Sequence, residues 1–300
     1  MTAEDGYDEE MLKVYQNMVI ERHLIWQRRQ AGEPGPWTTD SVLSNLKMTN
    51  MFRVLDPGSQ FVLTDLLCED PLDYLVRCVF YRITNLPKTW YAMKNMYAGR
   101  YPVASDFTRP GMADNLAVNL SKYRDAGNKI FSGAYIIVPN PGVVGSDKAV
   151  DAIALTKFFA EEKAPAFFAA QTQEERYHVL RSTKGLGRFL SMQILTDWGY
   201  AQEEDRENDF IVAGPGAVRG AAHLNSRLSS EDVIYDMAVE WHDHPIVNVN
   251  GHSLGLMNTQ NTLCEFSKYV RERVTPRKTS PYKPAHPGRQ PKPVLPAWMK

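Results

Sequence analysis

Residues 180–195 read LRSTKGLGRFLSMQIL, and this stretch decides how the fold is interpreted. A helical apolar pattern ends near Leu180 and a second one begins at Gly187, so the glycines between them predict a tight turn. Backbone N–H groups at the start of the second helix would face a phosphate, with two cations beside them and a leucine anchored in the core. The stretch therefore predicts a helix-hairpin-helix that binds DNA phosphates through Lys184, Gly185, Leu186, Gly187 and Arg188. A plain corner between two helices is the alternative.

The rest of the chain also favours helices. Apolar residues three or four apart predict a helix over 11–30, and Thr38 or Thr39 is expected to cap a second helix whose Val42, Leu43 and Leu46 face inward. Further helices are expected at about 60–84, 87–98, 112–125, 147–161, 173–181, 187–199, 230–241 and 259–272. Only residues 134–138 resemble a strand, with a buried helical turn as the alternative. We predict an all-α fold: one helical domain over 8–273 and an extended, basic, proline-rich tail over 274–300.

Composition excludes several classes of protein. The 300 residues are 43% hydrophobic and 23% charged, as in ordinary soluble proteins. No apolar run is long enough to span a bilayer, and the acidic N-terminus lacks the apolar core of a secretory signal. Three scattered cysteines suit a reducing compartment, so we expect a cytoplasmic protein without membrane contact. Residues 271–300 carry a net charge of +7, which is typical either of contact with a polyanion or of a solvated tail.

A second glycine-rich segment follows at 210–220, FIVAGPGAVRG. Gly214 and Gly216 flank a proline and predict a rigid turn that gives close access to the backbone. Arg219 is placed to reach a phosphate with its planar guanidinium. A purely structural turn is the alternative.

Charged and aromatic residues gather near the N-terminus. Glu21, Arg22, Arg28 and Arg29 span two turns of one helix, and Asn50 and Arg53 are expected on one helix face. A solvated face is the ordinary interpretation of such charge. Aromatic residues among arginines can instead stack an exposed base and hold its phosphates. We therefore predict a candidate site that includes Trp26, Trp37, Asp40 and Asp56.

Two further groups have simpler interpretations. His242, His244 and His252 suggest zinc, but no carboxylate partner is fixed, so surface or core roles are favoured and no metal site is predicted. Glu265 is expected to pair with Lys268 or Tyr269 along a helix whose Leu263, Phe266 and Val270 belong to the core.

The joint pattern resembles the bacteriophage α-glutamyl/putrescinyl thymine pyrophosphorylases, also called amino acid:DNA transferases. The helical domain of phage 5-hydroxymethyluridine DNA kinases is a close relative of that family. The resemblance covers about residues 15–272 and rests on these motifs: ER-x-x-IW-x-RR with PWT-x-D, N-x-FR-x-x-D, KGLG-x-FL-x-x-Q, GPG-x-x-RG and LCEF-x-KY. No kinase domain is attached to these residues, which favours a stand-alone transferase.

The resemblance implies a fold similar to helix-hairpin-helix DNA glycosylases and a reaction in host cytoplasm on double-stranded DNA. An amino acid or polyamine would displace (pyro)phosphate from phosphorylated 5-hydroxymethyluracil, with no cofactor, although Mg²⁺ on the leaving phosphate is an option. The base would flip onto Trp26 or Trp37. For this reaction we hypothesise catalysis by Glu21, Asp40, Asn50, Arg53 and Asp56, leaving-group contacts from Arg28, Arg53, Arg219, Gly214 and Gly216, and amine binding by Arg22, Glu265 and Lys268.

Two departures from the glycosylase pattern bear on the chemistry. Phe189 stands where bifunctional glycosylases place a lysine, and residues 212–215 hold no carboxylate where those enzymes use an aspartate. A Schiff base from the hairpin is therefore unavailable, which favours chemistry at the exocyclic 5-methylene. A base-excision enzyme and a non-catalytic DNA-binding protein are the alternatives.

Overall fold

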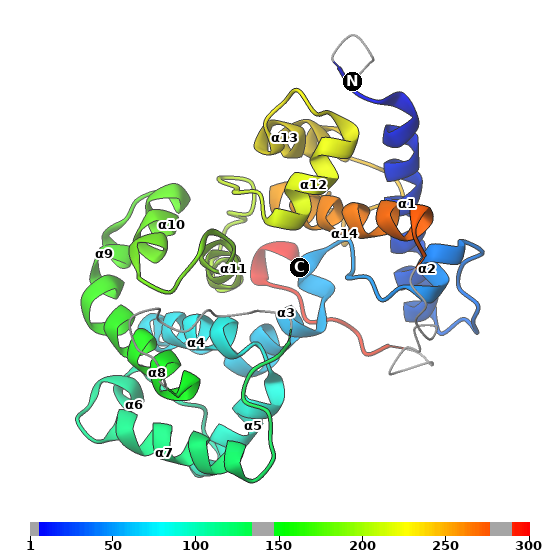
Figure 1. Ribbon diagram of the computed structural model, residues 1–300. Coiled ribbons are helices and arrows are strands. Elements are labelled where there is room, and N and C mark those ends of the chain that lie inside the picture. The colour runs from blue at the N-terminus through cyan, green and yellow to red at the C-terminus, as the bar shows by residue number, and fades with distance from the viewer. Residues whose placement is uncertain (1–5, 134–146, 277–289) are drawn as a thin grey trace. The chain divides into compact units, whose positions relative to one another are not determined.

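The computed structural model describes residues 6–133, 147–276 and 290–300, and helices dominate them (Figure 1). The all-α fold class is confirmed. The only β pairing in these residues is one bridge between Val249 and His252. The α-helices are α1 (Glu9–Ala31), α2 (Ser41–Asn45), α3 (Pro57–Phe61), α4 (Pro71–Thr84), α5 (Pro87–Met96), α6 (Ala104–Thr108), α7 (Met112–Asp125), α8 (Lys148–Phe158), α9 (Ala164–Ala169), α10 (Gln173–Ser182), α11 (Arg188–Gly199), α12 (Pro215–Leu224), α13 (Ser230–Glu240) and α14 (Leu256–Val274).

The chain divides into two compact units, each described by itself. The first is discontinuous and comprises Met1–Gln60 and Phe210–Lys300, and the second is Phe61–Asp209. The predicted single helical domain over 8–273 thus contains parts of both units.

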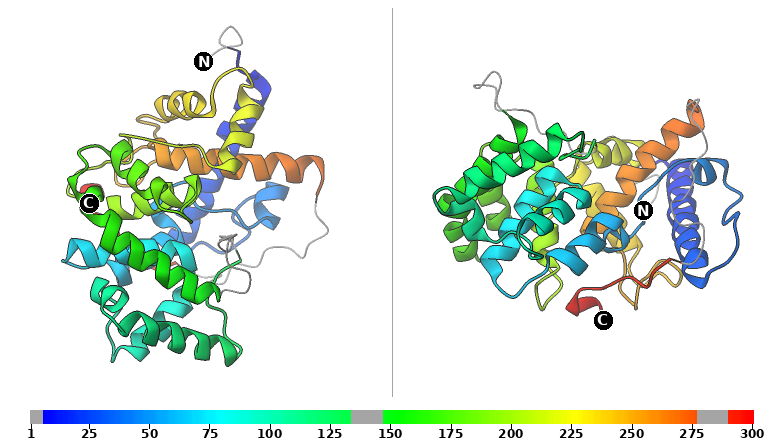
Figure 2. Two further views of the ribbon diagram at one scale, coloured as in Figure 1. Left: turned by 60° about the vertical axis from the view of Figure 1, so that its left-hand side comes forward. Right: turned by 90° about the horizontal axis from the view of Figure 1, so that it is seen from below.

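Helix α14 is the centre of the first unit. Figures 1 and 2 show it in orange beside α12 in yellow, and α1, α2 and α13 also contact it. Tyr15 of α1 is fully buried, and its hydroxyl lies 2.6 Å from the Thr262 hydroxyl of α14. Its ring meets Phe266 and Trp241 edge-on, so one aromatic residue joins three segments of this core.

Helix α11 is the buried helix of the second unit, with every residue from Leu190 to Gly199 inside. It packs against α4, where the Arg82 guanidinium meets both carboxylate oxygens of Asp197 at 2.5 Å. The Tyr74 hydroxyl donates to the main-chain oxygen of Asp197. A fully buried ion pair thus links the two helices.

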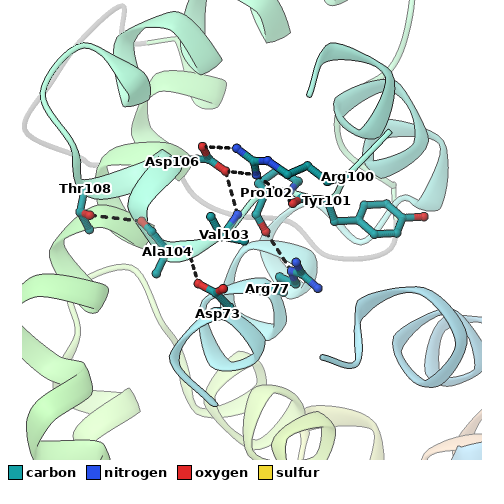
Figure 3. A network of polar contacts seen from close by, with 9 residues as sticks. All are labelled: Asp73, Arg77, Arg100, Tyr101, Pro102, Val103, Ala104, Asp106 and Thr108. Atoms are coloured by element: carbon teal, nitrogen blue, oxygen red, sulfur yellow. Dashed lines mark hydrogen bonds and ion pairs between the residues drawn. The ribbon is translucent and has the colours of Figure 1, made fainter. Parts of the chain in front are cut away.

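A polar network fixes the segment before α6, as Figure 3 shows. Arg77 of α4 donates to the carbonyl of Pro102, and Asp73 accepts from the N–H of Ala104 at 2.7 Å. Asp106 accepts two hydrogen bonds from Arg100, at 2.6 and 2.8 Å, and one from the N–H of Val103. Backbone polar groups that the helices leave unpaired are satisfied here by side chains.

Several predicted elements need correction. The helix expected over 60–84 is interrupted, because Asp70 caps a new helix that begins at Pro71. Asp40, rather than Thr38 or Thr39, caps α2, since its Oδ1 accepts from two N–H groups of the first turn. Asn50 and Arg53 share no helix face: Asn50 lies outside the helices and Arg53 opens a short 3₁₀ turn over Arg53–Leu55. The predicted strand at 134–138 lies outside the described residues.

The end of the predicted tail packs on the first unit. Val294 and Gln60 exchange two hydrogen bonds, at 2.9 and 3.0 Å, and Met299 is buried. Asn250 donates to the carbonyl of Met299. In the described parts of the chain, no helix combines the length and the apolar character that a membrane span requires.

Candidate functional site

Three residues of the predicted N-terminal site meet in the first unit. Arg22 is buried and donates to the side-chain oxygen of Asn50 at 2.9 Å and to the carbonyl of Met48. The N–H of Asn50 donates to Asp56 Oδ1 at 2.8 Å, and its side chain donates to the carbonyl of Leu55. The segment 48–56 is therefore held on α1 by hydrogen bonds to charged groups, which are stronger than neutral ones.

Helix α14 supplies two partners that the sequence analysis missed. Asn258 Oδ1 accepts from the N–H of Arg53 at 2.8 Å, and the Asn261 side chain donates to the carbonyl of Asn50 at 2.8 Å. Both asparagines are buried. The signal was a polar run, NTQNT at 258–262, on a helix that packs into the core.

The Asp56 carboxyl has an unusual affinity for protons. Its pKa is raised from 3.8 to about 6, mainly by burial and to a smaller extent by the nearby charge of Glu265, against the hydrogen bond from Asn50 and the positive charges of Arg53 and Arg22. A group that titrates near neutrality inside a polar cluster is typical of functional sites.

Replacing Asp56 by Asn is expected to remove one source of pH dependence. The folded carboxyl keeps its proton up to about pH 6, whereas the unfolded one loses it near pH 4, so ionisation of Asp56 lowers wild-type stability as pH rises between these values. The asparagine side chain keeps an acceptor for the N–H of Asn50 but does not titrate. In urea unfolding, the wild type should therefore lose stability relative to the variant from pH 4 to 6, and the difference should be constant above pH 7.

Buried His23 acts in the opposite direction. Burial lowers its pKa to about 4, so its contribution to stability is lost as pH falls below about 6.5. Because both proteins contain His23, its contribution cancels in the comparison. A difference that does not vary with pH would contradict the raised pKa of Asp56.

Glu265 and Lys268 form the predicted pair along α14. The Lys268 ammonium lies 2.5 Å from Glu265 Oε1, and the Glu265 side chain is almost fully buried. Glu265 Oε2 is also buried and has no hydrogen-bond partner among the described residues. Burial raises the pKa of the neighbouring Cys264 thiol, while the positive charges of Lys268, Arg219 and Arg53 oppose this rise. The positive charges of three predicted site residues thus all influence the Cys264 thiol on α14.

Glu21 belongs to a different group. It forms an ion pair with Arg28 at 3.0 Å, and Arg28 also donates to the carbonyl of Trp37. The Trp37 indole donates to the carbonyl of Glu33, and the Arg29 guanidinium stacks on its ring at 4.9 Å. The structure thus pairs Glu21 with Arg28 and binds both to the PWT segment. Trp26 lies beside the imidazole of His23 instead.

A cavity of about 180 Å³ adjoins Trp37. Its wall includes Trp37, Arg22, Arg29, Leu43 and Met48. Arg22 therefore contacts both the cavity and the network around Asn50. An aromatic wall with guanidinium groups nearby is suited to a planar ring that carries anionic substituents.

A helix, α12, begins directly after Gly214, where a rigid turn was predicted. Gly214 caps α12, but Gly216 and Gly220 lie within it and face α14. A Cβ on Gly220 would lie 2.0 Å from the carbonyl oxygen of Leu263, and one on Gly216 would lie 2.2 Å from Cys264 Sγ. These two glycines allow close helix packing, whereas Arg219 is exposed and remains a candidate phosphate contact.

Replacing Gly216 by Ala should destabilise the protein by about 1–3 kcal/mol, because the added methyl overlaps the Cys264 sulfur. Helix propensity alone would favour alanine by up to about 1 kcal/mol, so a net loss indicates the clash. Adding Cys264→Ala should restore most of the loss, and Cys264→Ala alone is the control. Strictly additive effects in urea unfolding would contradict this account.

The glycine turn of the second unit has the local geometry that we predicted. Gly185 has φ +103°, and a Cβ there would lie 2.5 Å from Leu155. Leu186 is buried, whereas Lys184 and Arg188 are exposed, and Gly187 caps α11 without a side-chain hydrogen bond. Phosphate binding by this turn stays a prediction.

One of the three histidines, His244, has a structural role. His244 Nδ1 accepts from the N–H groups of Ile246 and Val247, which closes a turn. Within the described ranges, no group of three or more His, Cys, Asp or Glu side chains is arranged to hold a metal ion.

Fold and site together define an all-helical protein with a partly buried carboxylate–arginine–asparagine network beside a tryptophan-lined cavity. The profile of the family described as "5-hmdU DNA kinase, helical domain" matches residues 9–279, and the chain belongs to this family. It is also similar to a 5-hmdU DNA kinase of Bacillus phage SP10, with 26% identity over 235 residues. That alignment covers 71% of this chain and 36% of the relative, so the chain spans about a third of the relative's length. No solved structure matches.

Family membership confirms the resemblance to the helical domain of the phage kinases. The narrower assignment to the transferases stays a prediction. The match extends over both units, since residues 9–279 include the glycine turn of the second and the polar network of the first.

Proposed function

We propose that this protein modifies 5-hydroxymethyluracil in DNA by transferring an amine to its phosphorylated 5-hydroxymethyl group. The relative's name states an action on 5-hmdU in DNA, which supports this type of base as the substrate. In this proposal the protein is phage-encoded and works on double-stranded DNA in the host.

The observation that carries the proposal is that the cavity beside Trp37 adjoins the hydrogen-bond network of Asn50 and Asp56. Arg22 lines the cavity beside Trp37 and at the same time binds Asn50, which binds Asp56. A flipped pyrimidine stacks on aromatic side chains in such pockets, at a cost of a few kcal/mol for leaving the duplex. Guanidinium groups nearby stabilise the charge that grows on a departing phosphate.

The reaction requires one substitution at carbon and one proton transfer. A carboxylate takes a proton from the incoming ammonium, and the freed lone pair forms the C–N bond at the 5-methylene carbon. The C–O bond breaks and its electron pair leaves with the phosphate, while the proton passes to the phosphate or to solvent. The bond between base and sugar stays intact.

Mass spectrometry of nucleosides tests this proposal. DNA with phosphorylated 5-hydroxymethyluracil is incubated with the full chain and single amines, then digested to nucleosides. We expect a product in which the amine has replaced the phosphate. Abasic sites would instead identify a glycosylase, and phosphorylation of unmodified 5-hydroxymethyl-DNA with ATP would identify a kinase. Either result without amine transfer overturns the proposal.

The glycine turn supports DNA binding as a component of this function. Lys184→Ala with Arg188→Ala should weaken binding equally on all sequences and reduce the slope of log K against log salt by about 2. Lys88→Ala with Lys122→Ala, two exposed cations of the same unit, is the matched control. Equal slopes in both double variants would make the turn a plain corner.

A further inference from the structure

A second and larger cavity lies in the first unit between α1, the start of α2 and α14. Its volume is about 460 Å³, which is within the usual range for small-molecule sites. Its polar lining consists of Asn17, Asp40, Ser41, Tyr269 and Arg273, and two valines complete it.

This cavity holds two opposite charges that do not neutralise each other. Asp40 and Arg273 both line it, and within the described residues neither forms an ion pair. The Arg273 guanidinium lies over the Tyr269 ring at 5.9 Å. A ligand that carries both a positive and a negative group would satisfy both side chains at once.

Asp40 is fixed in place and kept ready to receive a cation. Its Oδ1 accepts from the N–H groups of Val42 and Leu43, each at 2.8 Å, and its Oδ2 accepts from the Tyr269 hydroxyl at 2.6 Å. Burial and the bond to Asp40 raise the pKa of Tyr269 to about 12, so the phenol stays a donor at neutral pH. The proton of this hydrogen bond therefore stays on Tyr269.

Two sequence motifs 229 residues apart meet at this hydrogen bond. Asp40 is the last residue of PWT-x-D, and Tyr269 is the last residue of LCEF-x-KY. The PWT-x-D segment also contributes Pro36, Trp37 and Thr38 to the smaller cavity. A group bound at Asp40 is thus next to the segment that lines the smaller cavity, which is the proposed pocket for the flipped base. Arg273 belongs to α14.

We propose that this cavity binds an α-amino acid as a zwitterion, with its ammonium at Asp40 and its carboxylate at Arg273. The inference rests on the proposed function, for which it names the class of amine. The ammonium offers three donors to a carboxylate, and the planar guanidinium matches a carboxylate with two parallel hydrogen bonds. Asp40 is then the acceptor of the amine's proton, and diamines lack the group that Arg273 binds.

Calorimetric titration of the full chain, without DNA, tests binding directly. The probes are glycine, L-serine and L-glutamate, with ethanolamine and serinol as counterparts of the first two that lack the carboxylate, and putrescine as the diamine. We expect at least one amino acid to bind, and amines without a carboxylate to bind at least 10-fold more weakly. Equal binding of amino acids and these amines would overturn the inference, as would no binding of any amino acid.

Substitutions of the lining residues test whether amino acids bind in this cavity. Arg273→Met should weaken amino-acid binding at least 10-fold. Arg271→Met is the matched control, because Arg271 is an exposed arginine in the same last turn of α14 and lies outside the cavity lining. Asp40→Asn keeps a good helix cap but removes the charge, and it should weaken binding similarly. Equal effects of the two arginine substitutions would overturn the assignment.

Failure of the proposed amino-acid site and failure of the proposed reaction give different experimental results. If amino acids bind as expected but no amine is transferred to DNA, the proposed reaction is wrong and the binding site stands. If putrescine is transferred as well as amino acids and Arg273→Met has no effect, the reaction stands and this inference is wrong.

Discussion

An Asp197→Asn substitution is expected to destabilise the second unit by about 3–5 kcal/mol. The side chains of Asp197 and Arg82 are 0% and 2% exposed, and both carboxylate oxygens bind the guanidinium. Asparagine retains one acceptor oxygen, but the arginine would stay charged and buried without a counter-ion. The hydroxyl of Tyr74 is unaffected, because it donates to the main-chain oxygen.

Urea unfolding of the full chain, followed by tryptophan fluorescence, measures this effect. Arg124→Met is the matched control: it removes ion pairs with Asp125 and Asp147 in which the arginine is 45% exposed, and should destabilise the protein much less than Asp197→Asn because solvent screens these pairs. Replacing Arg82 by Met and Asp197 by Leu together should cost less than Asp197→Asn alone, because no charge stays buried. Equal losses for Asp197→Asn and Arg124→Met would contradict the account.

An Arg53→Ala substitution is expected to reduce amine transfer by about 10²–10³-fold, the loss typical of one contact to developing charge. Arg53 is buried, and its positive charge acts on both Asp56 and Cys264. Its N–H bond to Asn258 comes from the main chain and survives the substitution. A purely structural pair with Glu21 is not present, because Glu21 pairs with Arg28.

The matched control for Arg53 is Arg77→Ala. Both arginines are 8% exposed, but Arg77 belongs to the second unit and binds the carbonyls of Pro102 and Leu66. Single-turnover transfer and melting temperature are measured on both variants. We expect Arg77→Ala to lower the melting temperature and keep transfer by the folded protein. If Arg53→Ala behaves in the same way, Arg53 is structural and has no part in the reaction.

Local sequence signals determined most helices. The apolar periodicity after Asp8 predicted α1, and the limits of α7 were predicted to the residue. Turn glycines with a buried leucine predicted the corner between α10 and α11, and three-residue spacing predicted the pair of Glu265 and Lys268. Such features depend on residues a few positions apart, so periodicity and spacing are enough to find them.

Other features were decided by tertiary packing alone. Helix α12 was missed because Gly216 and Gly220 disfavour a helix locally and are explained only by the close approach of α14. The Asp40–Tyr269 and Arg53–Asn258 hydrogen bonds join residues more than 200 positions apart. The first unit likewise combines both ends of the chain around α14. Sequence therefore determined the helical fold class and proposed residues for the candidate site, whereas tertiary structure decided which of these residues meet, because burying α14 brings distant segments together.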